Sequence, residues 1–212
     1  MSIIAASAPV RICDCGGWTD TWFARHGFVF HVSVEPRVSV LVEVGDRRAG
    51  DPPATIEAGG SDGPYGFVPG TRPWGSQALI EAAIESVGIP EGRALRIRTS
   101  SDVPPGASTG TSASVTVALL GALGAAFGRP FSPGDVALAA HRVETERLGR
   151  QAGVQDQVAA AMGGVNFLAI SEYPHVEVTP LRVADALTAE LDARLVLVYL
   201  GRSHDSSDVH RA

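Results

Sequence analysis

The first 44 residues consist largely of short apolar runs rich in valine, a pattern that predicts β-strands. Pro36 marks a turn that would pair the last two of four strands, at Ile3–Ala6, Val10–Cys13, Val29–Val34 and Arg37–Val44. Glycine, proline and aspartate are dense from residue 46 to residue 75. That composition indicates loops, with two further short strands at Thr55–Ala58 and Tyr65–Val68.

Helical periodicity dominates the middle of the chain. Apolar spacing predicts helices over Ser76–Val87 (with Ser76 as a cap), Thr111–Phe127, Ser132–Leu148 and Val154–Met162. Further strands are expected at Ala94–Thr99, Asn166–Ile170, Val176–Thr179 and Leu195–Leu200, with a last helix from Asp205. Strands followed by a helical block and then by strands again predict an α+β fold, with a sheet packed on helices.

The composition is that of an ordinary globular domain: 45% of the 212 residues are hydrophobic, 19% are charged and the net charge is −6. No basic face is apparent, so we expect neither nucleic acid nor a membrane surface as a partner. No apolar stretch reaches the ~18 residues of a membrane span. Cys13 and Cys15 would lie on one strand, poorly placed for a disulfide, so we expect a reduced, cytoplasmic protein.

Lysine is absent, and all 17 basic residues other than histidine are arginine. A Walker-A loop and the ATP site of a protein kinase both require a lysine on the phosphates. Those two classes of nucleotide-binding protein are therefore excluded. Any phosphate chemistry must use backbone amides, arginine, helix dipoles and metal ions.

The segment from Pro104 to Ser114 is a glycine-containing loop that leads directly into a long apolar helix. The amides and partial positive charge of a helix N-terminus bind anions, and glycine allows a close approach. The structural alternative is a capped helix after a Pro/Gly turn. The candidate phosphate-binding residues are Pro105, Gly106, Ala107, Ser108, Thr109, Gly110, Thr111, Ser112 and Ala113.

Two other segments carry candidate chemistry. Asp156 lies near the start of a predicted helix and could orient or deprotonate an attacking hydroxyl. The alternative is an aspartate that only stabilises the helix dipole. Near the N-terminus, Trp18 and Asp20 follow a strand and two glycines, and could stack on a sugar and accept bonds from its hydroxyls. The alternative is a strand-to-loop turn with Trp18 in the core.

The order and spacing of these segments resemble those of the GHMP kinases. Ala8–Arg11 is similar to the Ala-Pro-Gly-Arg opening of galactokinases, and Pro104–Ser114 is similar to the glycine-rich second motif. Gly16–Thr21 resembles the Gly-Gly-Trp-Thr-Asp-Thr of fucokinases, and Gln155–Phe167 resembles D-glycero-D-manno-heptose 7-phosphate kinases. The resemblance covers nearly the whole chain and lies in the sugar-kinase branch.

The resemblance implies a fold like that of ribosomal protein S5 domain 2, with a left-handed βαβ crossover, over residues 1–212. It implies an ATP-dependent kinase that uses Mg²⁺ to phosphorylate a hydroxyl of a sugar or sugar phosphate, the anomeric hydroxyl being favoured. The implied roles are catalysis by Asp156 and Arg11, metal binding by Ser112 and Glu144 (with Glu146 competing for that role), and substrate binding by Trp18, Thr19 and Asp20.

The chain also departs from the family pattern. Ser108 replaces a glycine and Thr109 a leucine, so we expect altered ATP affinity, because a side chain at position 108 narrows the range of φ. We find no third glycine-rich motif of a ferredoxin-like C-terminal domain, and expect a fragment or a truncated relative that could self-associate as a homo-oligomer. The alternative functions are a non-catalytic or truncated nucleotide- and sugar-binding relative, and a kinase of metabolic acids.

Overall fold

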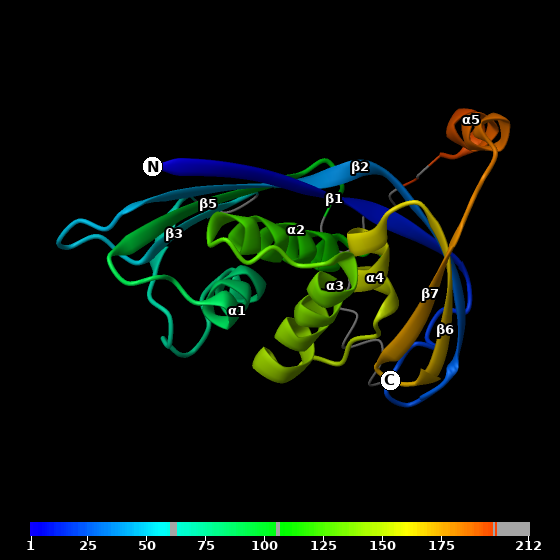
Figure 1. Cartoon of the computed structure of the whole chain (residues 1–212), viewed down its shortest axis with the longest axis horizontal. Helices are drawn as coiled ribbons and strands as arrows, with labels where there is room; N and C mark the ends of the chain where they lie inside the picture. Colours follow the sequence, from blue (N-terminus) through cyan, green and yellow to red (C-terminus); the bar gives the residue numbers. More distant parts are fainter. Residues whose placement is uncertain (60–62, 105–106, 197, 199–212) are drawn as a thin grey trace.

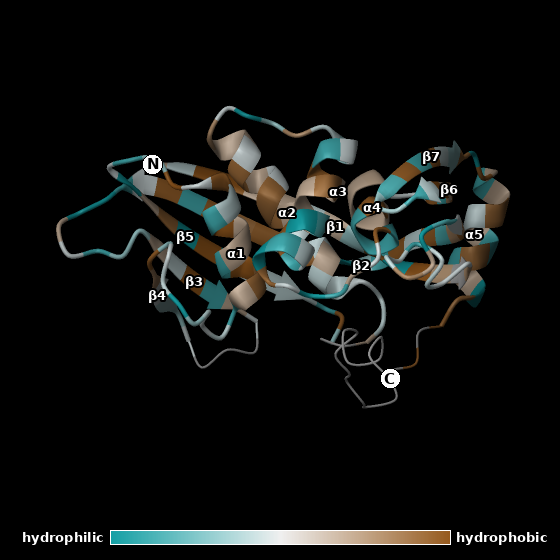
Figure 2. Cartoon of the chain, turned by 90° about the horizontal axis from the view of Figure 1, so that it is seen from below, coloured by the Kyte–Doolittle hydropathy of each residue, from teal (hydrophilic) through white to brown (hydrophobic). Residues whose placement is uncertain are grey.

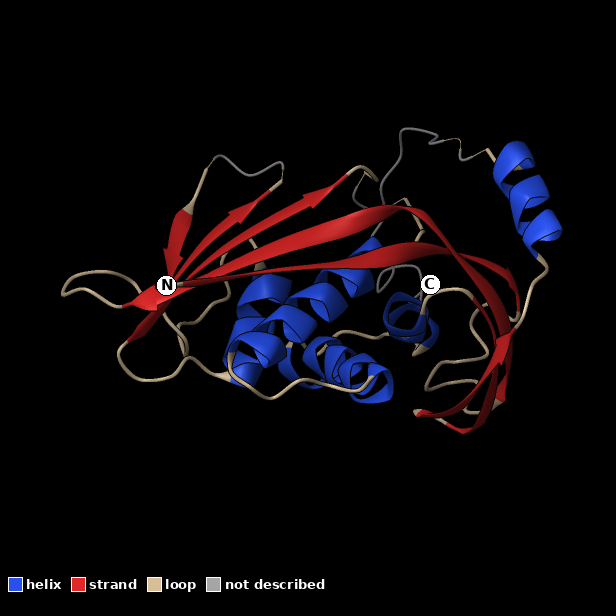
Figure 3. Cartoon of the chain, turned by 45° about the horizontal axis from the view of Figure 1, so that its top comes forward, coloured by secondary structure: helices blue, strands red, loops and turns tan. Residues whose placement is uncertain are grey.

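The structure is a computed structural model that describes residues 1–59, 63–104, 107–196 and 198. A curved sheet carries helices against one of its faces, as Figure 3 shows with strands in red and helices in blue. This arrangement confirms the α+β fold expected from the order of the elements. Within the described residues, no helix combines the length and the apolar character needed to cross a lipid bilayer.

The described part of the sheet has seven strands, in the order β4-β3-β5-β2-β6-β7, with β1 paired to β2. All pairs are antiparallel except β3 and β5, which run parallel and are connected through β4 and helix α1. The strands are β1 (Ser2–Cys15), β2 (Gly27–Asp46), β3 (Ala54–Ala58), β4 (Tyr65–Phe67), β5 (Arg93–Ser101), β6 (Val165–Glu172) and β7 (His175–Leu181).

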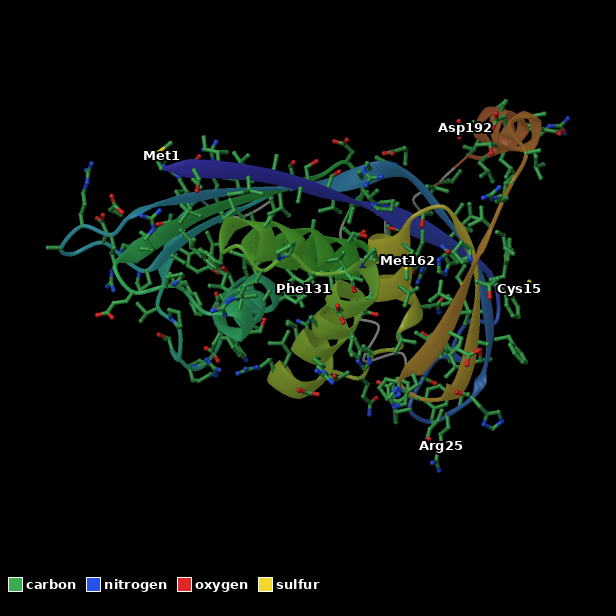
Figure 4. The ribbon with its side chains drawn as sticks, in the orientation of Figure 1. Met1, Cys15, Arg25, Phe131, Met162 and Asp192 are labelled. Carbon is green, nitrogen blue, oxygen red and sulfur yellow. The ribbon has the colours of Figure 1, made fainter. Side chains whose placement is uncertain are left out.

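The predicted division of the first 44 residues into four strands is wrong, because β1 and β2 are each continuous. Their register shifts between Pro9 and Val10, which pair with Arg37 and Val34. Pro36 lies in this irregularity, where a residue without an N–H is tolerated, and it forms no turn. The first part of β2 pairs with β6 and the second part with β5. β1 therefore runs from near Met1 to Cys15 at the far end of the molecule (Figure 4).

The helical block is confirmed. Its helices are α1 (Ala78–Val87), α2 (Thr111–Ala126), α3 (Pro133–Arg142) and α4 (Gln155–Met162), and a π-helical turn, η1 (Val143–Arg147), continues α3. Ser132 caps α3 by accepting a hydrogen bond from the Asp135 amide. Ser76 does not cap α1, since the residue at that position is Gln77 and no side chain forms a capping bond.

Helix α5 (Asp185–Arg194) was not expected from the sequence, because its polar residues are distributed around the whole helix. None of its residues is buried, and it stands apart from the other helices in Figure 1. Leu195, Val196 and Val198 of the last predicted strand lie outside any strand. The remaining residues of that strand, at positions 197, 199 and 200, lie outside the described residues. The helix expected from Asp205 lies outside them too.

The core lies between the sheet and α2, which is largely hydrophobic in Figure 2. Leu119, Leu120 and Leu123 of α2 are at most 1% exposed, and they belong to the same cluster as Val42 and Ile97 of the sheet. Burial on nearly every side explains why α2 has almost no polar stripe. The packing fixes the start of α2, and with it the loop that precedes the helix.

Two glycines of α2 provide a test of this packing. A Cβ at Gly124 would lie 2.7 Å from the Arg129 carbonyl oxygen and 2.8 Å from the Phe131 ring, whereas a Cβ at Gly121 meets no atom within 4 Å. We expect Gly121→Ala to stabilise the protein by roughly 0.5–1 kcal/mol through helix propensity. Gly124→Ala should destabilise it by roughly 1–3 kcal/mol through overpacking. Urea unfolding measures both, and equal stabilisation by the two variants would contradict the packing described.

Candidate active site

A cleft of about 1070 Å³ opens where the end of β1, the loop before α2 and the loop before α4 come together. These segments are distant in sequence, and the sheet brings them to one place. The cleft therefore collects all three segments that sequence analysis singled out. Its lining includes Arg11, Trp18, Asp20, Glu144 and Asp156.

Arg11 and Asp156 form an ion pair in this cleft. Arg11 Nε donates to Asp156 Oδ1 at 2.8 Å, and Arg11 Nη2 lies 2.7 Å from the same oxygen. Arg11 Nη1 donates to the Ser108 carbonyl oxygen at 2.6 Å, and the Arg11 amide donates to the Thr109 carbonyl oxygen at 2.9 Å. A single arginine thus joins β1, the loop before α2 and the first turn of α4.

The loop before α2 takes the left-handed conformation at Ser108 (φ 59°) and at Gly110 (φ 74°). Glycine adopts this conformation readily, whereas a residue with a Cβ is strained by roughly 1–2 kcal/mol. This strain is the physical reason for a glycine preference at position 108. Ser114 Oγ donates to the Pro9 carbonyl oxygen at 2.7 Å and so ties the start of α2 to β1.

Among the described residues, no side chain caps α2, and the first amide of the helix with a backbone acceptor there is that of Ser114, which donates to the Gly110 carbonyl oxygen. The amides that precede Ser114 lie at the N-terminus of α2, the end of a helix that stabilises a bound anion. Most of the predicted loop residues line the cleft: Ala107, Ser108, Thr109, Gly110, Thr111 and Ser112. Ala113 is fully buried and does not line it, and Pro105 and Gly106 lie outside the described residues.

Asp20 is only 1% exposed, and its carboxylate lies against the start of α4. Asp20 Oδ2 accepts a hydrogen bond from the Gln155 amide at 2.9 Å, and Oδ1 accepts one from Gln155 Nε2 at 3.3 Å. A Cβ at Gly153 would lie 2.1 Å from Oδ2, so only glycine fits there without displacing the carboxylate. Asp20 therefore serves as a remote cap for α4, whose N-cap residue Val154 supplies no side-chain bond.

Trp18 and Thr19 occupy different environments. Trp18 lines the cleft and is 50% exposed, with its ring edge-on to Phe23, so the alternative that places Trp18 in the core is wrong. Thr19 does not line the cleft. Its hydroxyl lies 2.8 Å from the Gly16 carbonyl oxygen and 3.0 Å from that of Phe28, and it closes the loop between β1 and β2.

Glu144 and Glu146, the two candidate metal ligands, are clearly distinguished by exposure. Glu144 lines the cleft, is 7% exposed and accepts a hydrogen bond from Gln157 Nε2 at 3.0 Å. The Glu146 side chain is 67% exposed and lies near Arg142 instead. The described residues contain no cluster of three or more His, Cys, Asp or Glu side chains suited to a metal. A single carboxylate with Ser112 nevertheless suits Mg²⁺, which usually takes one or two protein carboxylates together with phosphate oxygens and water.

Burial and charge act against each other around the ion pair. Burial alone would lower the pKa of Arg11, but the charge and hydrogen bond of Asp156 raise it above the ordinary value. Burial raises the pKa of Asp20, in opposition to the hydrogen bond from the Gln155 amide. Burial and the Arg11 charge lower the pKa of His31 to about 4, so this histidine is neutral at pH 7.

Sequence analysis missed several residues of the cleft. Gln155 and Gln157 flank Asp156 and line the cleft with it, and their place in that motif was the available signal. Arg150 also lines the cleft, and in a chain without lysine any arginine near Asp156 was a candidate. Behind the cleft, Tyr173 donates to the Ala152 carbonyl oxygen at 3.0 Å and so supports the loop before α4, a contact with no signal in the sequence.

The chain is similar to known proteins of one family. Residues 77–164 match the GHMP kinases N terminal domain. Among curated proteins, it is 34% identical over 113 residues to a D-glycero-alpha-D-manno-heptose 7-phosphate kinase of Campylobacter jejuni, covering 53% of this chain and 33% of that protein. It is 25% identical to the bifunctional fucokinase/GDP-fucose pyrophosphorylase of Arabidopsis thaliana, covering 92% of this chain and 20% of that protein.

The same relationship is seen in the fold. A D-glycero-D-manno-heptose 1-phosphate kinase from Bacteroides thetaiotaomicron superimposes with a TM-score of 0.78 at 24% identity, covering 91% of this chain and 64% of that one. This chain thus has the GHMP kinase fold, and its residues 77–164 are similar to the N-terminal domain of that family. It spans about a third of the heptose 7-phosphate kinase that it matches.

Proposed function

We propose that this chain binds ATP and Mg²⁺ and transfers the γ-phosphoryl group to a hydroxyl of a sugar or sugar phosphate. The observation that carries the proposal is the Arg11–Asp156 ion pair, which lies in one cleft with the uncapped start of α2. Phosphoryl transfer needs few covalent contributions from the protein, so positioning and electrostatics suffice. The heptose phosphate kinase and fucokinase relatives support a sugar as the acceptor.

The nucleotide phosphates would lie on the loop from Pro105 to Ala113, with the helix amides and the positive end of the α2 dipole as donors. Within that loop, Ala113 would contribute only its backbone, since its side chain is buried. Ser112 and Glu144 would hold Mg²⁺, which supplies charge neutralisation for the phosphates when bound. The low exposure of Glu144 supports it over Glu146 as the ligand.

Asp156 would orient the acceptor hydroxyl and accept its proton as the oxygen attacks the γ-phosphorus, with ADP as the leaving group. Arg11 would hold the Asp156 carboxylate in place and stabilise the charge that develops on the transferred group. Both roles agree with the geometry, because Arg11 contacts the carboxylate and the loop at the same time. The proposal favours the anomeric hydroxyl of the acceptor.

The acceptor side of the proposal rests on Trp18, Thr19 and Asp20. Trp18 is exposed in the cleft and is suited to stack on a sugar face. Thr19 and Asp20 would act mainly by shaping the site, since their side chains already hold the β1–β2 loop and the start of α4. The cytoplasm, which supplies ATP and keeps thiols such as Cys13 reduced, is the proposed location.

A non-catalytic nucleotide-binding relative is the other candidate, and the intact ion pair together with buried Glu144 disfavours it. Two expectations stay predictions: that this chain is a fragment or a truncated relative, and that it forms a homo-oligomer. A kinase of metabolic acids would not need the exposed Trp18 in its cleft.

Asp156→Asn tests the catalytic assignment. The amide can still accept a hydrogen bond from Arg11, but it cannot take up the hydroxyl proton. We therefore expect sugar-dependent ADP formation to fall by about 100- to 10,000-fold, the usual contribution of a general base, with little loss of stability. Asp135→Asn is the matched control, because Asp135 also lies in the first turn of a helix but not in the cleft. Near-normal turnover by Asp156→Asn would contradict the assignment of Asp156 as the general base.

Glu144→Gln tests the metal site. Loss of this carboxylate should raise the Mg²⁺ concentration for half-maximal ATP binding by roughly 10-fold, the lower end of the effect of altering the shell of a metal site. Glu146→Gln, only two residues away but exposed, should leave that concentration unchanged. Calorimetric titration of ATP at a series of Mg²⁺ concentrations measures both variants. If both variants change the Mg²⁺ concentration for half-maximal ATP binding equally, Glu144 is not the specific metal ligand.

A further inference from the structure

Arg150 has no assigned part in the chemistry above, yet it lines the same cleft as Arg11 and Asp156. Each nitrogen of the Arg11 guanidinium already contacts either the Asp156 carboxylate or the Ser108 carbonyl oxygen. The Arg150 guanidinium, by contrast, forms no hydrogen bond or ion pair with any of the residues that the structure describes. It is half-buried, so part of its hydration is already lost. A half-buried cation in a cleft, without a partner from the described chain, is a candidate for contact with an anion.

The backbone fixes where Arg150 emerges. The π-helical turn η1 ends as Leu148 donates to the Val143 carbonyl oxygen, and Gly149 reverses the chain in the left-handed conformation (φ 64°). The Arg150 amide then donates to the Glu144 carbonyl oxygen at 2.9 Å. The Arg150 backbone therefore lies beside that of Glu144. The Tyr173 bond to Ala152 holds the chain on its other side.

The charge of the cleft makes this position significant. Four acidic side chains line the cleft, those of Asp20, Asp102, Glu144 and Asp156. Among the described lining residues Arg11 and Arg150 are the basic ones, and Asp156 already neutralises Arg11. The chain has no lysine, so it has no ammonium group to offer a phosphate other than its N-terminus. A phosphate entering this acidic cleft needs a cation, and among the basic side chains described in its lining Arg150 is the one without an acidic partner.

We propose that Arg150 binds a phosphate group of a ligand in this cleft. A guanidinium presents paired N–H donors that match two phosphate oxygens, a stronger and more directional contact than a point charge. The phosphate has two possible sources, the nucleotide or the phosphate ester on a sugar phosphate acceptor. The assignment rests on the proposed function for these ligands but not on turnover, because binding alone reports it.

The test is calorimetric binding to the full chain, one ligand at a time, for wild type, Arg150→Gln, Arg150→Lys and Arg96→Gln. Arg96 is the matched control, since it is exposed on β5 and does not line the cleft. The probes are ATP and ADP with Mg²⁺, D-glycero-D-manno-heptose 7-phosphate and the unphosphorylated heptose. Loss of a charge-assisted contact should weaken binding of the relevant phosphate by roughly 10- to 100-fold in Arg150→Gln, and Arg150→Lys should restore part of it.

The pattern of losses identifies the source. Weaker binding of the heptose 7-phosphate alone, with the unphosphorylated heptose unchanged, assigns Arg150 to the acceptor phosphate. Weaker binding of ATP and ADP assigns it to the nucleotide. The proposal is overturned if Arg150→Gln binds every probe as Arg96→Gln does, or if the wild type binds no phosphorylated probe. If Arg150→Gln loses binding of phosphorylated probes but the wild type transfers no phosphoryl group, the result would support the Arg150 phosphate site and contradict the proposed kinase activity.

Discussion

The ion pair between Arg11 and Asp156 is the contact on which the cleft depends. Arg11 lies on β1, which pairs with β2, and its side chain reaches both the loop before α2 and the first turn of α4. Its position is set by β1, whose pairing with β2 continues on both sides of the register shift. If the arginine moved, the Asp156 carboxylate and the loop before α2 would lose their common support. One side chain, Arg11, therefore serves both the proposed chemistry and the packing of the cleft.

The absence of lysine constrains the remaining chemistry. In the proposed function, phosphate would be bound by backbone amides at the start of α2, by a metal ion and by arginine. The buried core around α2 makes the first of these possible, because it holds the helix start rigidly against β1 through Ser114. The acidic lining makes the other two necessary. A cleft with this charge is suited to phosphates that arrive with a cation, which is consistent with an ATP-dependent kinase.

Elements with strong local patterns were predictable, and those fixed by long-range contacts were not. The apolar spacing was enough to place α2 and α4, and the position of Asp156 near a helix start made it a candidate. The cleft residues Arg11 and Glu144 were singled out only by the resemblance to the GHMP kinases. The continuity of β2 through Pro36 depends on pairing with β1, β5 and β6, and short-range turn signals gave the wrong answer. The burial of Asp20 against Gln155 depends on a contact across 135 residues, which no local pattern reveals.

The most direct test is a double-mutant cycle on the free energy of unfolding with Arg11→Gln, Asp156→Ala and the double variant, since alanine, unlike asparagine, cannot accept the Arg11 hydrogen bond. If the pair links β1, the loop and α4 as described, the two effects should be non-additive, with a coupling of about 1 kcal/mol or more, within the range for groups in one network. Additivity to within about 0.3 kcal/mol, as for independent sites, would show that the pair does not hold the cleft together.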